Sequence, residues 1–230
     1  MTPAARSSGE EVDWARIAER LCFLFPPVIG VGAVGVAREL DPGVPGLGLT
    51  LVVLGSFGYT FLTVGLALVL FFDARRIRTR ASVAWRPNPW LNAAFAIVWA
   101  PAAGVAYLYR RHRHFGTRPG WSGWWLVVAL SLVATLLGAA VATIAVVLEF
   151  PGLLLSAIGI AGAIAVGAFP VAIHQDAAYV CTRKTAWNPN PGGYLGLAFV
   201  SLFVPPIQPV LAAYYLYNRR RALGRLSRSR

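Results

Sequence analysis

Six long stretches without a charged side chain follow one another along this chain, and they constrain its fold more than any other feature. About 20 apolar residues in an α-helix cross the hydrocarbon core of a bilayer, and a helix satisfies its own backbone hydrogen bonds there. We therefore expect an all-α integral membrane protein with six apolar helical segments. The stretches are residues 21–37, 47–72, 90–109, 121–148, 150–173 and 191–217.

Charged residues make up only 13% of the chain, and they gather in short clusters between the apolar stretches. A soluble domain normally carries about a quarter. Lys184 is the only lysine among the 21 basic residues, so the positive charge is almost entirely arginine. Arginines that flank apolar spans act as topology signals and face anionic lipid headgroups. We expect membrane lipids with anionic headgroups as partners, and no nucleic acid.

One segment of the chain occurs twice. Each copy has an aspartate, a basic loop, a W-x-P-N-P element, an apolar stretch with a central proline, and a Y-L-Y-x-R ending. From the central proline onward the copies align without gaps, with Tyr107 and Tyr215 in equivalent places. Two long apolar stretches precede each copy. We therefore expect two repeated three-segment halves, residues 21–116 and 117–224, a plan common among membrane proteins that form a site between halves.

The chain ends lie outside the repeat. Residues 1–20 predict an amphipathic interfacial helix, capped by Ser7 or Ser8, with its apolar face on the membrane. Residues 225–230 form a basic tail.

The repeated segment resembles a group of uncharacterised archaeal multi-pass membrane proteins that share the order aspartate, basic loop, W-x-P-N-P, apolar stretch and Y-L-Y-x-R. The resemblance covers residues 73–116 and 176–224, roughly 40% of the chain. It implies a location in the bilayer and no particular activity. The second copy departs from the pattern, because Asn218 stands where the first copy has Arg110 and about six residues are inserted before Pro209.

The W-x-P-N-P element has a structural interpretation and a functional one. Asparagine is a good N-cap and proline is favoured at the first helical position, so Asn88 and Asn190 are predicted to start helices. In the alternative, Asp73 with Asn88, and Asp176 with Asn190, form polar clusters that bind an ion or a headgroup. The side chains predicted to lie at the lipid surface are Trp85, Tyr109, Arg110, Arg111, Trp187, Tyr217, Arg219 and Arg220.

Two topologies are compatible with the apolar stretches. If all six span the membrane, the basic clusters divide between both sides. If the third and sixth segments enter and leave on one side, every basic cluster except Arg38 lies on that side, as the positive-inside rule favours. Pro101 and the group Pro205, Pro206 and Pro209 would break those two segments. We favour the re-entrant arrangement in the cell membrane, with both termini cytoplasmic.

Few motifs suggest chemistry. The G-x-G-x-x-G match at residues 30–35 lies inside an apolar span, which indicates helix packing rather than nucleotide binding. His112 and His114 lie among arginines, which predicts a solvated basic loop and no metal site. His174 and Asp176 are expected to face water at a helix end, or alternatively to form part of a proton relay. We find no catalytic constellation and expect no cofactor.

Two functions from different classes remain open. The first is a non-catalytic membrane scaffold or regulatory subunit, whose basic cytoplasmic face binds lipid or a partner, either another membrane protein or a second copy of the chain. The second is a small-solute or ion channel or transporter with a site between the halves at Pro101, Gln208 and Pro209. The absence of charge within the apolar stretches favours the first, and the duplicated broken segments favour the second.

Overall fold

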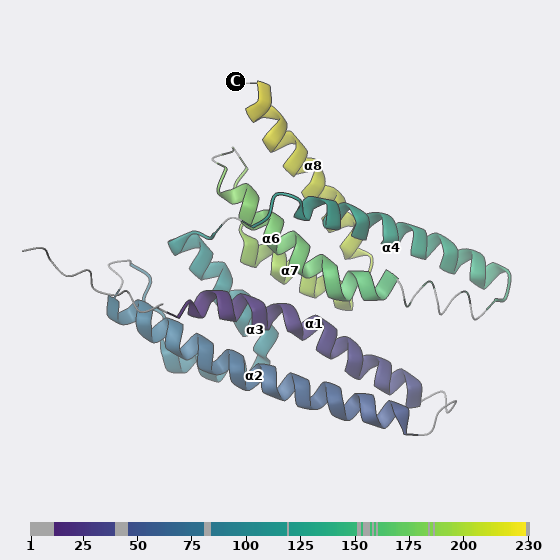
Figure 1. Ribbon diagram of the computed structural model, residues 1–230, viewed down its shortest axis with the longest axis horizontal. Coiled ribbons are helices and arrows are strands. Elements are labelled where there is room, and N and C mark those ends of the chain that lie inside the picture. The colour runs from purple at the N-terminus through teal and green to yellow at the C-terminus, as the bar shows by residue number, and fades with distance from the viewer. Residues whose placement is uncertain are drawn as a thin grey trace, which may run out of the picture.

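The computed structural model describes residues 12–39, 46–80, 84–118, 120–150, 153, 157, 159, 161–183, 185 and 187–228 (Figure 1). Every regular element within these residues is a helix, so the prediction of an all-α chain is confirmed for this part. The elements are α1 (Trp14–Glu39), α2 (Leu47–Arg80), α3 (Pro89–Phe115), α4 (Trp124–Val147), a π-helical turn η1 (Ile164–Ala168), α6 (Phe169–Cys181), α7 (Pro191–Phe203) and α8 (Ile207–Arg228).

Four of the described helices are long and apolar enough to cross a membrane: Trp14–Arg38, Leu47–Thr79, Pro89–Phe115 and Trp124–Val147. Their outer surfaces are apolar as well, and large side chains such as Phe57, Phe61 and Val98 are about three-quarters or more exposed, at 74%, 76% and 83%. Contiguous apolar surface of this kind marks contact with a membrane or another apolar partner. The fold therefore suits a membrane protein.

The predicted interfacial helix was expected to end at residue 20, but helix α1 is continuous across this position. It begins after Asp13, whose Oδ1 accepts a hydrogen bond from the backbone N–H of Arg16 at 3.2 Å, as an N-cap does. Residues 14–20 are thus the first turns of α1 and not a separate interfacial helix. Ser7 and Ser8, the predicted caps, lie outside the described residues.

Glycines bring α1 and α2 into close contact along their length. A Cβ atom on Gly35 would lie 2.6 Å from the backbone nitrogen of Val52, and one on Gly55 would lie 2.8 Å from the Cα of Gly32. Small residues allow such approach between membrane helices. The predicted packing role of residues 30–35 is therefore confirmed.

The two proline-containing segments both leave the helical conformation in the middle. In α3 the break is at Trp99, with φ −152° and ψ 80°, two residues before Pro101. Between α7 and α8 it is at Val204, with φ −128° and ψ 79°, two residues before Pro206. Proline removes a helical hydrogen bond and its ring clashes with the preceding turn, which accounts for both breaks.

The break lets α3 fold back on itself. Near its start, the ring of Trp90 lies 4.8 Å from that of Phe71 on α2. Near its end, Nε of Arg111 lies 2.8 Å from Oδ2 of Asp73, only two residues further along α2. Both arms of α3 therefore lie against the same C-terminal part of α2.

Helices α3 and α7 cross in the middle of the molecule, between the α1–α2 arm and the arm that contains α4 and α6 (Figure 1). A Cβ atom on Gly192 would lie 2.5 Å from the backbone nitrogen of Tyr109, and Nδ2 of Asn190 donates to the Tyr109 carbonyl at 3.0 Å. This crossing joins two hydrophobic clusters: one formed by α1, α2 and α3, the other by α4, α6 and α8, with α7 contributing to both.

Substitution of Gly192 by alanine tests the crossing. The added methyl group meets backbone atoms of Tyr109, which cannot rotate away, so we expect a loss of about 1–3 kcal/mol in the free energy of unfolding. The matched control is Gly159→Ala, since no atom of the described residues lies within 4 Å of a Cβ there. Thermal unfolding in detergent measures both. Equal stability of the two variants would contradict the close crossing.

Candidate functional site

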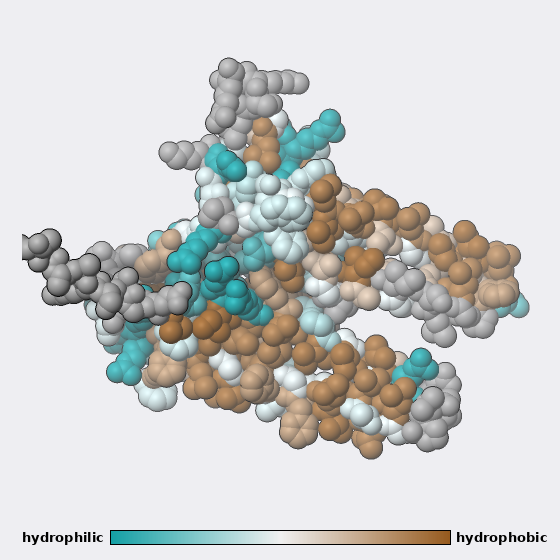
Figure 2. Space-filling view, viewed as in Figure 1, coloured by the Kyte–Doolittle hydropathy of each residue, from teal (hydrophilic) through white to brown (hydrophobic). Residues whose placement is uncertain are grey.

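Many of the hydrophilic side chains gather at the end of the molecule where α1 begins and α2 and α3 end, while hydrophobic residues dominate the two arms (Figure 2). A pocket of about 1100 Å³ opens at this end. Five arginines and three acids line it, together with aromatic and polar residues from α4, α6 and the segment before α4. The charged lining residues are Asp13, Arg16, Glu19, Arg20, Asp73, Arg76, Arg111 and Arg118.

A buried carboxylate organises the α2–α3 side of this pocket. Asp73 is 2% exposed, and its Oδ2 accepts hydrogen bonds from the Tyr107 hydroxyl and from Nε of Arg111, each at 2.8 Å. Tyr107 and Arg111 are one helical turn apart and so share a face of α3. A buried charge is tolerated when it is paired and hydrogen-bonded, and here one oxygen has both kinds of partner.

The second half contains a cluster of the same composition. Asp176 on α6 is fully buried, and its Oδ2 accepts from the Tyr215 hydroxyl at 2.7 Å and from Nε of Arg219 at 2.6 Å. Tyr215 and Arg219 occupy the positions equivalent to Tyr107 and Arg111. A tryptophan of the W-x-P-N-P element packs on each tyrosine, with ring centroids 5.5 Å apart in the first cluster and 5.3 Å in the second.

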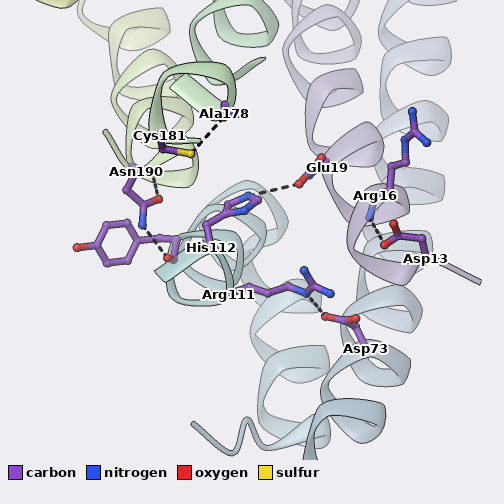
Figure 3. Close-up of polar contacts among 11 residues, drawn as sticks. Asp13, Arg16, Glu19, Asp73, Arg111, His112, Ala178, Cys181 and Asn190 are labelled. Carbon is purple, nitrogen blue, oxygen red and sulfur yellow. Dashed lines mark hydrogen bonds and ion pairs between the residues drawn. The ribbon is translucent and has the colours of Figure 1, made fainter. Parts of the chain in front are cut away.

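These contacts change the interpretation of several predicted site residues. Arg111 and Arg219 were expected at the lipid surface, but their side chains are only 21% and 13% exposed and they bind buried aspartates (Figure 3 shows the Asp73 pair). The side chains of Trp85 and Trp187 are half-buried against tyrosines rather than free at an interface. The aspartates thus accept their hydrogen bonds from the C-terminal part of α3 and the middle of α8.

The two asparagines cap helices, as the structural interpretation predicted. Oδ1 of Asn88 accepts from the backbone N–H groups of Trp90 and Leu91, at 3.0 and 3.3 Å. Oδ1 of Asn190 accepts from Gly193 at 3.1 Å. Asn88 is exposed whereas Asp73 is buried, so the first proposed polar cluster does not form. The partners of Asp176 are likewise Tyr215 and Arg219, not Asn190.

The remaining predicted surface residues are exposed. Tyr109 and Tyr217 are 42% and 64% exposed, and Arg110 and Arg220 are exposed too. Tyr109 and Arg110 line the edge of a second, mainly apolar groove of about 830 Å³ between α1, α2, α3 and α7.

The candidate solute residues do not meet in one cavity. Pro101 lines the apolar groove, but Gln208 and Pro209 do not. Gln208 is 2% exposed, and both polar atoms of its amide lack a hydrogen-bond partner among the described residues. Its neighbours Ile207 and Leu211 belong to the second hydrophobic cluster. Gln208 therefore does not line the groove that contains Pro101.

Two histidines depart from the sequence-based expectation. His112, predicted in a solvated loop, is 7% exposed, because α3 continues to Phe115 and carries it on the same face as Gly104 and Leu108. His174 is 1% exposed and faces His112, with ring centroids 5.5 Å apart. Nε2 of His112 lies 3.4 Å from Oε1 of Glu19 (Figure 3). The four-residue spacing of Gly104, Leu108 and His112 is the sequence signal that could have predicted a buried face of α3 that includes His112.

Comparisons with models of protein families, with curated proteins and with solved structures find no match to this chain.

Removal of the buried carboxylate in the second cluster should destabilise the protein strongly. Asp176→Ala leaves Arg219, which is 13% exposed, without its charge partner, and we expect a loss of about 3 kcal/mol or more. The double variant Asp176→Leu with Arg219→Met leaves no unpaired charge and should lose less. Arg220→Ala, at an exposed neighbour, should stay within about 0.5 kcal/mol of the wild type.

Unfolding in mixed detergent micelles measures all three proteins. If the double variant is less stable than Asp176→Ala, the loss of stability comes from removal of the ion pair itself and not from an unpaired arginine.

Proposed function

We propose that this protein is a non-catalytic multi-pass membrane scaffold or regulatory subunit that binds anionic lipid headgroups in the arginine-lined pocket at its polar end. The observation that carries the proposal is the lining of that pocket by five arginines beside helices of membrane-spanning length. Basic pockets beside membrane helices bind anionic headgroups.

The charges of the pocket leave a positive excess for a ligand. Asp13 lies 3.0 Å from Arg118, and Asp73 lies 2.8 Å from Arg111, so two arginines are neutralised within the protein. Of the other charged lining residues, Arg16 and Arg20 lie near one acid, Glu19, while Nη1 of Arg76 donates to the Val12 carbonyl at 2.9 Å. Arg16 and Arg20 are exposed and one turn apart on α1, so both guanidinium groups are accessible to a headgroup.

The folded-back α3 supports the re-entrant topology. Its two ends lie beside the same part of α2, so the basic residues before and after it share one side of the membrane in this arrangement. The equivalent break before Pro206, and the equivalent aspartate cluster, support the same course for α7 and α8 and a repeat of two three-segment halves. Together with the positive-inside rule, this course supports a cytoplasmic location of both termini.

Conduction is the weaker alternative. Its support is the amide of Gln208, which is buried without a hydrogen-bond partner among the described residues and could bind a polar solute. The groove that contains Pro101 is apolar, however, and Gln208 lies outside its lining. A pathway between the halves needs polar groups along its length, so the described residues favour the scaffold.

Single-cysteine labelling tests the topology. In a background of Cys22→Ala and Cys181→Ala, we expect Arg86→Cys, Arg113→Cys, Asn188→Cys and Arg221→Cys all to react with an impermeant maleimide from the same, cytoplasmic side. All four positions are exposed, so accessibility does not confound the result. Labelling of positions 86 and 113 from opposite sides would contradict re-entry and favour six spans.

Headgroup binding can be tested with matched charge changes. The double variant Arg16→Gln with Arg20→Gln should bind a short-chain anionic phospholipid about 30-fold more weakly than the wild type, since each basic residue near an anionic surface contributes about 1 kcal/mol. Calorimetric titration in detergent measures the affinity. A phosphatidylcholine with the same chains and free glycerol phosphate separate lipid binding from binding of phosphate alone.

The control for this titration is Arg78→Gln with Arg113→Gln, which makes the same change in net charge at exposed positions outside the pocket lining. An equal loss of affinity in both double variants, or no preference of the wild type for the anionic lipid, would exclude the pocket as the binding site.

A further inference from the structure

Three side chains that can bind a metal ion converge at the base of the polar pocket. They come from three helices: Glu19 from α1, His112 from α3 and His174 from α6. One donor atom of each lies within 4.8 Å of the others. The two histidines are buried, and the side chain of Glu19 is only 17% exposed.

Packing against neighbouring side chains does not by itself explain why both histidine rings are buried. Nε2 of His112 lies 3.4 Å from Oε1 of Glu19 without forming a hydrogen bond, and the other three ring nitrogens have no hydrogen-bond partner in the part of the chain that the structure describes. A neutral imidazole has one donor and one acceptor, and burial of both without partners is unfavourable. Phe23 packs edge-to-face on His174 at 5.1 Å, which orients the ring but satisfies neither nitrogen.

We propose that Glu19, His112 and His174 bind a divalent transition-metal ion of the Zn²⁺ class. Two imidazoles and a carboxylate form a donor set typical of zinc sites that keep one coordination position open. The set differs from that of Mg²⁺ or Ca²⁺ sites, which are built from oxygen ligands. Each histidine would then use one of its unpartnered nitrogens as a ligand.

The geometry needs little adjustment to hold an ion. Three atoms no more than 4.8 Å apart lie within about 2.8 Å of a common centre. Zinc binds nitrogen and oxygen ligands at about 2.0–2.2 Å, so each donor moves inward by about 0.7 Å. Small rotations of the three side chains, with no change of backbone, produce such a shift.

The site is accessible and its local charge is compensated. Glu19 and His112 line the pocket, so an ion can enter from it and the open coordination position faces it. Arginines disfavour a cation, but Arg111 is bound to Asp73 and Arg118 to Asp13. The exposed Arg16 and Arg20 favour an anion as the fourth ligand.

The proposed ion would also join the two halves of the molecule. Glu19 and His112 belong to the first half, with α1 and α3, whereas His174 lies on α6 in the second. A ligand that binds only the folded arrangement stabilises it by mass action. Zinc should therefore raise the thermal unfolding temperature as well as bind.

Metal content of the full-length protein in detergent tests the proposal. The protein is purified with a tag that contains no histidine, stripped with a chelator, equilibrated with Zn²⁺ and freed of excess. We expect one zinc per chain by elemental analysis, a higher unfolding temperature, and a visible absorption spectrum of bound Co²⁺. Glu19→Gln and His174→Ala should each weaken zinc binding on the order of 100-fold or more, since even indirect partners of a ligand contribute 10- to 100-fold.

The matched control is His114→Ala, which removes an exposed histidine two residues from His112 and should bind zinc as the wild type does. Wild-type protein without stoichiometric zinc would overturn the proposal, and this result does not depend on the folding of any variant. Loss of zinc in His114→Ala with retention in Glu19→Gln and His174→Ala would overturn it too. Headgroup binding is measured separately, so failure of one proposal leaves the other standing.

Discussion

The packing of α2 with α3, and that of α6 with α8, depends on a buried aspartate that must be paired. Asp73 lies near the end of an apolar helix, where a carboxylate without partners would be strongly unfavourable. Its donors, Tyr107 and Arg111, come from the far arm of α3. They reach it only because the chain reverses direction at Trp99. The break before Pro101 and the buried ion pair therefore act together. The break lets the second arm of α3 return to α2, and the ion pair stabilises that contact.

The sequence predicted the features that depend on local chemistry. Asn88 and Asn190 cap helices as the asparagine–proline pairs indicated, and backbone breaks precede Pro101 and Pro206 because proline cannot continue the preceding turn. The partners of the two aspartates were also partly readable. In both copies a tyrosine and an arginine four residues apart lie on one helical face, and an aspartate lies in the last turns of an earlier helix, α2 or α6.

The sequence did not show whether the side chains just beyond the apolar stretches are buried or exposed. The third stretch ends at residue 109, but α3 continues to Phe115, so His112 lies on a buried face instead of in a loop. The partners of His112 come from α1 and α6, far away in the chain, and depend on how the two halves meet. Charge patterning indicates a membrane side; it does not indicate which arginines bind aspartates and which remain exposed.

The two ends of the molecule have different physical properties, and this difference bears on function. At the polar end, the hydrogen bond from Asn190 to the Tyr109 carbonyl and the contact between His112 and His174 connect the part with α1, α2 and α3 to the part with α4, α6, α7 and α8. Toward the other end the arm with α1 and α2 and the arm with α4 diverge, and apolar surface borders the space between them (Figure 2). Apolar surfaces that face lipid gain little from contact with each other, since the lipid is as apolar as they are. The spacing of the arms is therefore determined mainly at the polar end, where the proposed headgroup or ion would lie among residues of α1, α3 and α6. A ligand at the polar end would act on the relative position of the two arms without entering the space between them. A regulatory membrane subunit requires such an effect, whereas a conducting pathway requires that the solute enter that space.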